Sequence, residues 1–166
     1  MATIITDLKE SFRRGNIYIQ LIYINVGVFV LTTLTEVILQ LFNRSLGGMF
    51  EWLELPASLS RFIVQPWSIL TYMFMHAGVL HILFNMLWLY WFGALFLNFF
   101  SAKHLRGVYI LGGICGGILY MAAYNIFPYF QPMTEYSFML GASASVLAIV
   151  AATAYREPNY LSLIHI

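Results

Sequence analysis

Three polar side chains interrupt an apolar stretch near the middle of the chain. The stretch FMHAGVLHILFNMLWLY, residues 74–90, contains His76, His81 and Asn85. Because His81 and Asn85 are four residues apart, a helix would place them on one face, one turn apart. Ser143 begins another apolar segment, in the sequence GASAS. Serine, histidine and asparagine side chains brought to one site can support acyl transfer.

Acyl transfer needs a nucleophile and donors that stabilise an oxyanion. A serine at a helix N-terminus lies beside unpaired backbone N–H groups and the positive end of the helix dipole. The Asn85 amide and a ring N–H of His81 are neutral donors that can complete an oxyanion hole. The small residues Ala142 and Ala144 would let a neighbouring helix and a substrate backbone approach Ser143.

Each of these residues, taken alone, also has a packing interpretation. Histidine or asparagine in a membrane helix often links neighbouring helices, contributing about 0.6 kcal/mol on average. Serine in such a helix usually bonds to carbonyls of its own helix. The spacing of His81 and Asn85, and the small-residue start of the Ser143 helix, favour a functional site, as ionisable residues inside a membrane generally do.

The composition indicates a membrane protein. The 166 residues are 61% hydrophobic and 9% charged, whereas soluble domains average about 45–50% apolar and about 25% charged residues. The net charge of +1 argues against nucleic-acid partners, which need a basic face. The single cysteine, Cys115, excludes an intrachain disulfide and a thiolate metal cluster.

Four segments are predicted to cross the membrane, since a helix needs about 20 apolar residues for this. They cover about residues 17–42, 78–100, 107–127 and 139–155. The predicted fold class is all-α, a polytopic transmembrane helix bundle that follows an N-terminal segment, residues 1–16. The fourth span is short and rich in small residues, which suits a central position.

Basic residues predict the orientation of the bundle. Six lie on the side of the N-terminus and two on the other: Lys9, Arg13, Arg14, Lys103, Arg106 and Arg156, against Arg44 and Arg61. The N-terminus is therefore expected in the cytoplasm and the protein in the plasma (inner) membrane. The loops at 43–77 and 128–138 then face outward, and Ser143, His81 and Asn85 share one depth near the outer face.

The loop at 43–77 is long and apolar. Loops beyond about 12–15 residues are usually functional or disordered, and this one is too apolar for disorder. One interpretation is a set of short amphipathic helices lying in the outer interface. The other is a loop packed on the bundle.

The two motifs together resemble those of the rhomboid family of intramembrane serine proteases. HAGVLHILFNMLW carries the family's HxxxxHxxxN pattern, and GASA is close to its GxSG motif. The resemblance implies that Ser143 is the nucleophile and that His81, Asn85 and the Ser143 N–H form the oxyanion hole. It gives His76 and Gly141 structural roles at the site. It also implies transmembrane protein substrates, a lipid environment and no cofactor or metal.

Two departures from the family pattern leave the catalytic groups in place. The family often has Trp-Arg where this chain has Trp67 followed by Ser68. Ala144 replaces the glycine after the nucleophile, a change between two small residues.

The larger departure from the family pattern concerns the general base. Rhomboids have six core spans with the base histidine in the sixth, whereas four are expected here. Only His165 follows Ser143, and the helix of Ser143 would carry the chain about 18 Å inward before it could turn back. We therefore expect that His165 is not the base, that the sequence is C-terminally incomplete, and that residues 1–166 alone are inactive, with the base beyond residue 166.

Two other functions remain open. A non-catalytic rhomboid-like protein that binds transmembrane helices would need none of Ser143, His81 and Asn85. A transporter subunit would need ionisable residues deeper in the bilayer, but Glu36 is the one carboxylate inside any predicted span.

Overall fold

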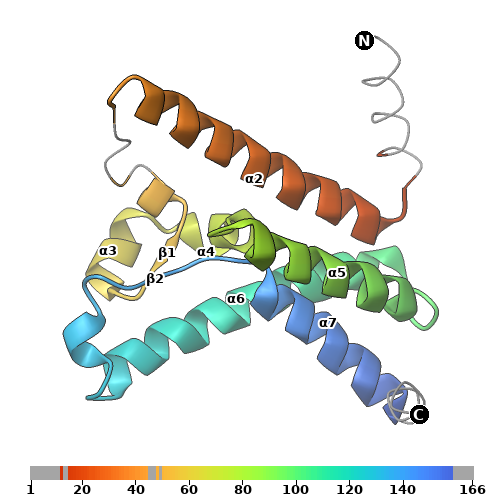
Figure 1. Ribbon diagram of the computed structural model, residues 1–166. Coiled ribbons are helices and arrows are strands. Elements are labelled where there is room, and N and C mark those ends of the chain that lie inside the picture. The colour runs from red at the N-terminus through yellow and green to blue at the C-terminus, as the bar shows by residue number, and fades with distance from the viewer. Residues whose placement is uncertain (1–11, 13–14, 45–47, 49, 159–166) are drawn as a thin grey trace.

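The computed structural model describes residue 12, residues 15–44, residue 48 and residues 50–158, and it is a bundle of helices (Figure 1). Three helices in this part of the chain are long and apolar enough to cross a membrane: α2 (Ile17–Leu41), α5 (Val79–Phe96) and α6 (Ala102–Ile126). The helix α7 (Ser143–Arg156) is apolar but shorter. The predicted all-α, polytopic class is confirmed.

The observed helix bounds differ from the predicted spans at three places. The second predicted span, 78–100, ends earlier, because α5 stops at Phe96 and a turn follows. The third, 107–127, begins earlier, because the Ser101 hydroxyl accepts a hydrogen bond from the His104 N–H and caps α6. The fourth, 139–155, begins later, because Met139 belongs to a strand and α7 begins only at Ser143.

Small residues set the contact between α6 and α7. A Cβ added at Gly112 would overlap the Cβ of Ala148, and one added at Gly116 would lie 2.5 Å from the Cβ of Ala144. The two glycines are four residues apart on α6, and the two alanines are four residues apart on α7. A face of small residues on α6 therefore packs against a face of small residues on α7. Such faces let membrane helices approach closely, because packing rather than water exclusion drives their association. This contact positions the helix that begins with Ser143.

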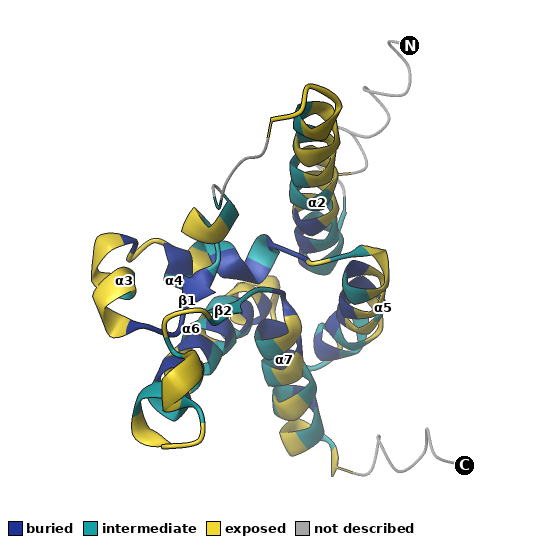
Figure 2. Ribbon diagram, turned by 60° about the vertical axis from the view of Figure 1, so that its left-hand side comes forward, coloured by how far each residue is buried: buried dark blue, intermediate teal, exposed yellow. Residues whose placement is uncertain are grey.

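Helix α2 packs on the bundle only through its first half. Its buried residues are Ile17, Leu21 and Asn25, Phe29 is partly buried against the core, and most apolar side chains beyond Phe29 are exposed, as Figure 2 shows. The Asn25 amide donates to the hydroxyl of Tyr109 on α6 at 3.2 Å. That hydroxyl donates to the carbonyl of Met73 at 3.3 Å. The buried polar chain thus joins α2 and α6 to the segment just before α5.

The segment between α2 and α5 folds into short elements. They are the 3-10 helices η1 (Phe50–Trp52) and η2 (Tyr72–Phe74), the helices α3 (Leu59–Val64) and α4 (Ser68–Thr71), and the strand β1 (Leu55–Pro56). Leu55, Tyr72 and Met73 are buried in the core, whereas the α3 residues Ile63 and Val64 are 77% and 62% exposed. The segment therefore packs on the bundle, and the interfacial location of α3 stays a prediction.

A short antiparallel strand pair lies at the same end of the bundle. β1 pairs with β2 (Phe138–Met139), with Leu55 opposite Met139 and Pro56 opposite Phe138. β2 follows the 3-10 helix η3 (Gln131–Met133) and precedes α7. The pairing fixes the chain just before Ser143 to the segment between α2 and α5.

Candidate active site

One open groove between α5 and α7 contains the three predicted polar side chains. Its volume is about 410 Å³, and it is lined by His81, Asn85 and Ser143 with five apolar residues: Leu80, Phe84, Trp88, Val146 and Leu147. His81 and Asn85 come from the first two turns of α5, and Ser143 is the first residue of α7. The structure thus brings together residues more than fifty positions apart in the sequence.

Ser143 is exposed to the groove at the N-terminus of α7. The preceding Ala142 provides no side-chain cap, so no side chain accepts from the first-turn N–H groups of the helix. Unpaired N–H groups at a helix start attract and stabilise negative charge. The surroundings of the Ser143 hydroxyl therefore favour an oxyanion formed beside it.

The hydrogen bonding of His81 orients its ring. The backbone N–H of Ala77 lies 3.5 Å from Nδ1, which accepts the hydrogen bond. The proton of a neutral imidazole is then on Nε2, the tautomer being assigned from this contact. His81 can therefore act as a donor through Nε2.

Asn85 is buried, and one of the two N–H donors of its side-chain amide is already hydrogen-bonded within the protein. One N–H of Nδ2 donates to the His81 carbonyl at 3.1 Å, one turn back along α5. An amide nitrogen carries two donors, so a second N–H remains for a ligand in the groove. The bond to the helix carbonyl limits rotation of the amide.

Because Gly141 has no side chain, the backbone can pass close to His81 just before α7 begins. Its φ is +116°, a conformation that L side chains rarely adopt. A Cβ at this position would lie 2.7 Å from Nε2 of His81 and 3.8 Å from Nδ2 of Asn85. Any other residue at position 141 would place its Cβ against these side chains, and the backbone or the His81 ring would have to shift.

His76 lies against His81 at the entrance to α5. The ring centroids are 5.1 Å apart in an edge-on arrangement. Burial, helped by the neighbouring His81, lowers the pKa of His76 to about 4, although the backbone of Phe74 opposes the shift. Neither ring nitrogen makes a hydrogen bond of good geometry. The neutral ring of His76 thus packs against the His81 ring and restricts its movement.

A comparison with known families assigns this part of the chain. The family model described as Rhomboid domain matches residues 64–165, more than half of the chain. The chain belongs to the rhomboid family. A 55-residue segment is also 38% identical to RHOMBOID-like protein 7 of Arabidopsis thaliana, and covers 33% of this chain and 18% of that protein. The rhomboid assignment makes the chain an integral, multi-pass membrane protein in a lipid environment.

The described part of this rhomboid domain contains three histidines. His76 and His81 lie at the groove, and His104 lies at the start of α6, beyond the opposite end of α5. The Nδ1 of His81 accepts from the Ala77 N–H, and His76 is buried. His165, which the sequence argues against as the base, lies outside the described residues. Among the described residues, no hydrogen bond joins the Ser143 hydroxyl to a histidine, and His81 as assigned is a donor through Nε2.

Sequence reasoning missed the contacts that hold Gly141. Its N–H donates to the carbonyl of Tyr72 at 2.9 Å, and the Tyr72 hydroxyl donates to the carbonyl of Gly113 at 2.6 Å. No motif marks Tyr72. The four-residue spacing of Gly112 and Gly116, matched by Ala144 and Ala148, is a signal that could have predicted the contact between α6 and α7.

Proposed function

We propose that this rhomboid domain belongs to an intramembrane serine endopeptidase. The observation that carries the proposal is the common groove of Ser143, His81 and Asn85. Residues 17–166 would be the partial membrane domain and residues 1–16 a cytoplasmic segment. Substrates would be transmembrane helices cleaved near the outer face of the plasma membrane.

In the proposed reaction, the Ser143 hydroxyl attacks a substrate carbonyl and forms a tetrahedral intermediate. The carbonyl oxygen becomes an oxyanion that accepts from the Ser143 N–H, the free Asn85 N–H and Nε2–H of His81. The proton removed from the Ser143 hydroxyl is passed to the leaving nitrogen, the C–N bond breaks to release the amine, and water hydrolyses the acyl-enzyme that remains. Preorganised donors of this kind stabilise developing charge without reorganisation during the reaction.

The hydroxyl proton needs a base, because a serine hydroxyl is a weak nucleophile on its own. His81 as assigned donates from Nε2, so it is unsuited to that role. We propose that a histidine outside the described residues accepts the proton. His76 and Gly141 would keep His81 in place and would take no proton.

A non-catalytic rhomboid-like protein that binds transmembrane helices is the second candidate. It is favoured by one observation: among the described residues, no histidine is hydrogen-bonded to the Ser143 hydroxyl, and His81, which lines the same groove, is assigned as a donor. Both candidate functions have the same fold, but only the endopeptidase requires a reactive Ser143.

Labelling of the full-length protein with a fluorophosphonate probe tests the proposal. We expect labelling that Ser143→Ala abolishes and Ser145→Ala leaves intact, because Ser145 is a buried neighbour on the same helix. Residues 1–166 alone should stay unlabelled. An unlabelled full-length protein would favour the non-catalytic candidate, and strong labelling of residues 1–166 would place a base within them.

A further inference from the structure

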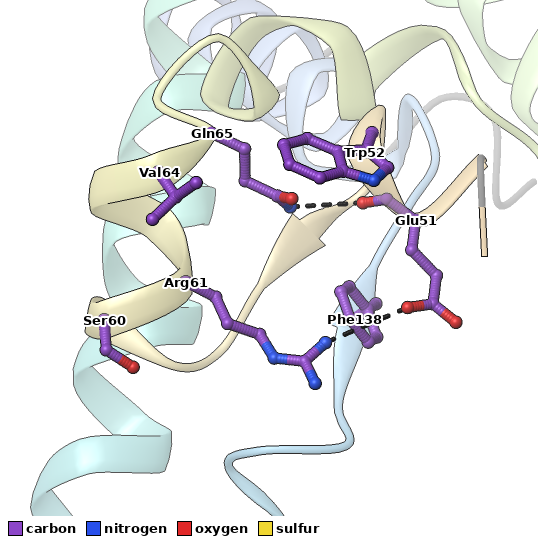
Figure 3. A pocket seen from close by; sticks show the side chains of 7 residues that line it. All are labelled: Glu51, Trp52, Ser60, Arg61, Val64, Gln65 and Phe138. Atoms are coloured by element: carbon purple, nitrogen blue, oxygen red, sulfur yellow. Dashed lines mark hydrogen bonds and ion pairs between the residues drawn. The ribbon is translucent and has the colours of Figure 1, made fainter.

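We propose that Arg61 is a positioning residue that fixes the segment leading to Ser143. The inference rests on the proposed function for its effect on catalysis, but its structural part stands on its own. Arg61 lies on α3, in a cavity of about 330 Å³ at the end of the bundle that carries the strand pair (Figure 3). Residues from η1 and β2 line the same cavity.

The guanidinium of Arg61 contacts three groups from two distant parts of the chain. Its Nη1 lies 3.8 Å from a carboxylate oxygen of Glu51, and its Nε lies 3.8 Å from one of Glu135. Its Cζ lies 5.4 Å from the ring centroid of Phe138. A planar guanidinium can hold carboxylates and an aromatic face together, which an ammonium group does less well.

Glu135 is itself anchored to the bundle. The hydroxyl of Ser58, which is 2% exposed, donates to Oε1 of Glu135 at 2.9 Å. One oxygen of the carboxylate therefore accepts from a buried hydroxyl, and the other faces Arg61. The contacts of Arg61 with Glu51, Glu135 and Phe138 form what we call the Arg61 clasp.

The Arg61 clasp is close in sequence to the catalytic groups. Phe138 pairs with Pro56 in the strand pair, and Gly141, three residues later, lies against His81. A shift of β2 would therefore move the Gly141 backbone relative to Nε2 of His81. The first-turn N–H groups of α7 would move with it.

The contribution of the Arg61 clasp to global stability should be small. The side chains of Arg61, Glu51 and Glu135 are 45%, 52% and 60% exposed, so solvent screens both ion pairs. Small misplacement of a catalytic group nevertheless has a large effect on rate. A loss of kcat without a loss of stability therefore distinguishes a positioning role from a general structural role.

The test compares Arg61→Gln with the wild-type full-length protein in proteoliposomes. We expect kcat to fall about three- to tenfold, because a small misplacement of a catalytic group lowers the rate. KM should change less than about twofold, and the melting temperature should stay within about two degrees. Arg61→Lys should restore part of kcat.

Two controls show whether the effect passes through the Arg61 clasp. Glu135→Gln should lower kcat similarly, and the double variant should be no worse than either single one, because coupled residues are non-additive. Arg44→Gln removes another exposed arginine, without an ion pair among the described residues, and should leave kcat unchanged. Additive losses, or a loss at Arg44, would overturn the proposal.

Hydrogen exchange gives a readout independent of catalysis. In a Ser143→Ala background, Arg61→Gln should speed the exchange of peptides covering residues 135–142 and leave those covering α6 unchanged. Unchanged exchange at 135–142 would overturn the inference, and so would a rise in KM alone or a kcat loss that follows the melting temperature. If the wild-type protein neither cleaves nor labels, the proposed function fails, and the exchange measurement alone decides the role of Arg61.

Discussion

The backbone N–H of Gly141 donates a hydrogen bond of 2.9 Å to the carbonyl of Tyr72. Tyr72 is fully buried, and its hydroxyl donates at 2.6 Å to the carbonyl of Gly113 on α6. One residue therefore ties both α6 and the segment before Ser143 to the bundle core. The start of α7, where an oxyanion would form, is held by core contacts.

Gly141→Ala is expected to disable the site with little change in the rest of the fold. The new Cβ would lie 2.7 Å from Nε2 of His81 at a φ of +116°, so the ring or the backbone must move. We expect kcat to fall by about two orders of magnitude, comparable to loss of one oxyanion donor. Cleavage kinetics check this, and Gly27→Ala is the control, because nothing lies within 4 Å of a Cβ there. Wild-type kcat in Gly141→Ala would show that this close approach is unimportant.

Asn85→Ala tests the oxyanion role of the buried amide. Removing one preorganised donor should lower kcat by about one to three orders of magnitude with little change in KM. The bond from Asn85 to the His81 carbonyl lies within one helix, so its loss should leave the bundle folded. Asn98→Ala, an exposed residue in the turn after α5, provides the control. An unchanged cleavage rate would assign Asn85 to packing.

Gly112→Ala tests the close contact between α6 and α7. The added methyl group would overlap the Cβ of Ala148, so α7 must shift. Overpacking of this kind costs about 1–3 kcal/mol, which thermal unfolding in detergent would detect. Ala148→Gly in the same chain should restore most of the stability. Gly107→Ala has open space and should be neutral or stabilising; absence of rescue by Ala148→Gly would show that the contact is not the cause.

His76 should make the protein less stable in acid. Its pKa is lowered to about 4 from 6.5, so the unfolded chain binds the proton more tightly than the folded one. Stability is then complete above about pH 6.5, falls as the pH decreases toward 4, and changes no further below that. His76→Gln should flatten this part of the profile when melting temperatures are compared across pH. Parallel profiles for the two proteins would contradict the assignment of the titration to His76.

The orientation of the bundle stays a prediction and can be measured directly. Cysteines introduced at Arg44 and Lys103, both exposed, should react from opposite sides in a Cys115→Ala background. The positive-inside rule predicts that position 44 is labelled from outside and position 103 only after permeabilisation. The reverse pattern would place the groove at the cytoplasmic face and exclude cleavage near the outer surface.

The sequence by itself determined the features that depend on local spacing. Hydropathy over about twenty residues predicted α2 closely, and the four-residue spacing of His81 and Asn85 predicted their common helical face. The family motifs predicted Ser143 and Gly141 as candidate site positions, and the structure places Ser143 in the groove and Gly141 beside His81. These features follow from helix geometry and side-chain chemistry, which a short stretch of sequence contains.

Only the tertiary structure decided how these elements meet. Ser58 and Glu135 are 77 positions apart, and Tyr72 and Gly113 are 41 apart. No local pattern indicates such pairs, because they form only after helices and strands pack. The helix of the fourth predicted span begins at Ser143 rather than near residue 139 for the same reason: pairing with β1 keeps Phe138 and Met139 in a strand. Strand pairing and helix packing, which act over long sequence distances, therefore determine where Ser143 lies.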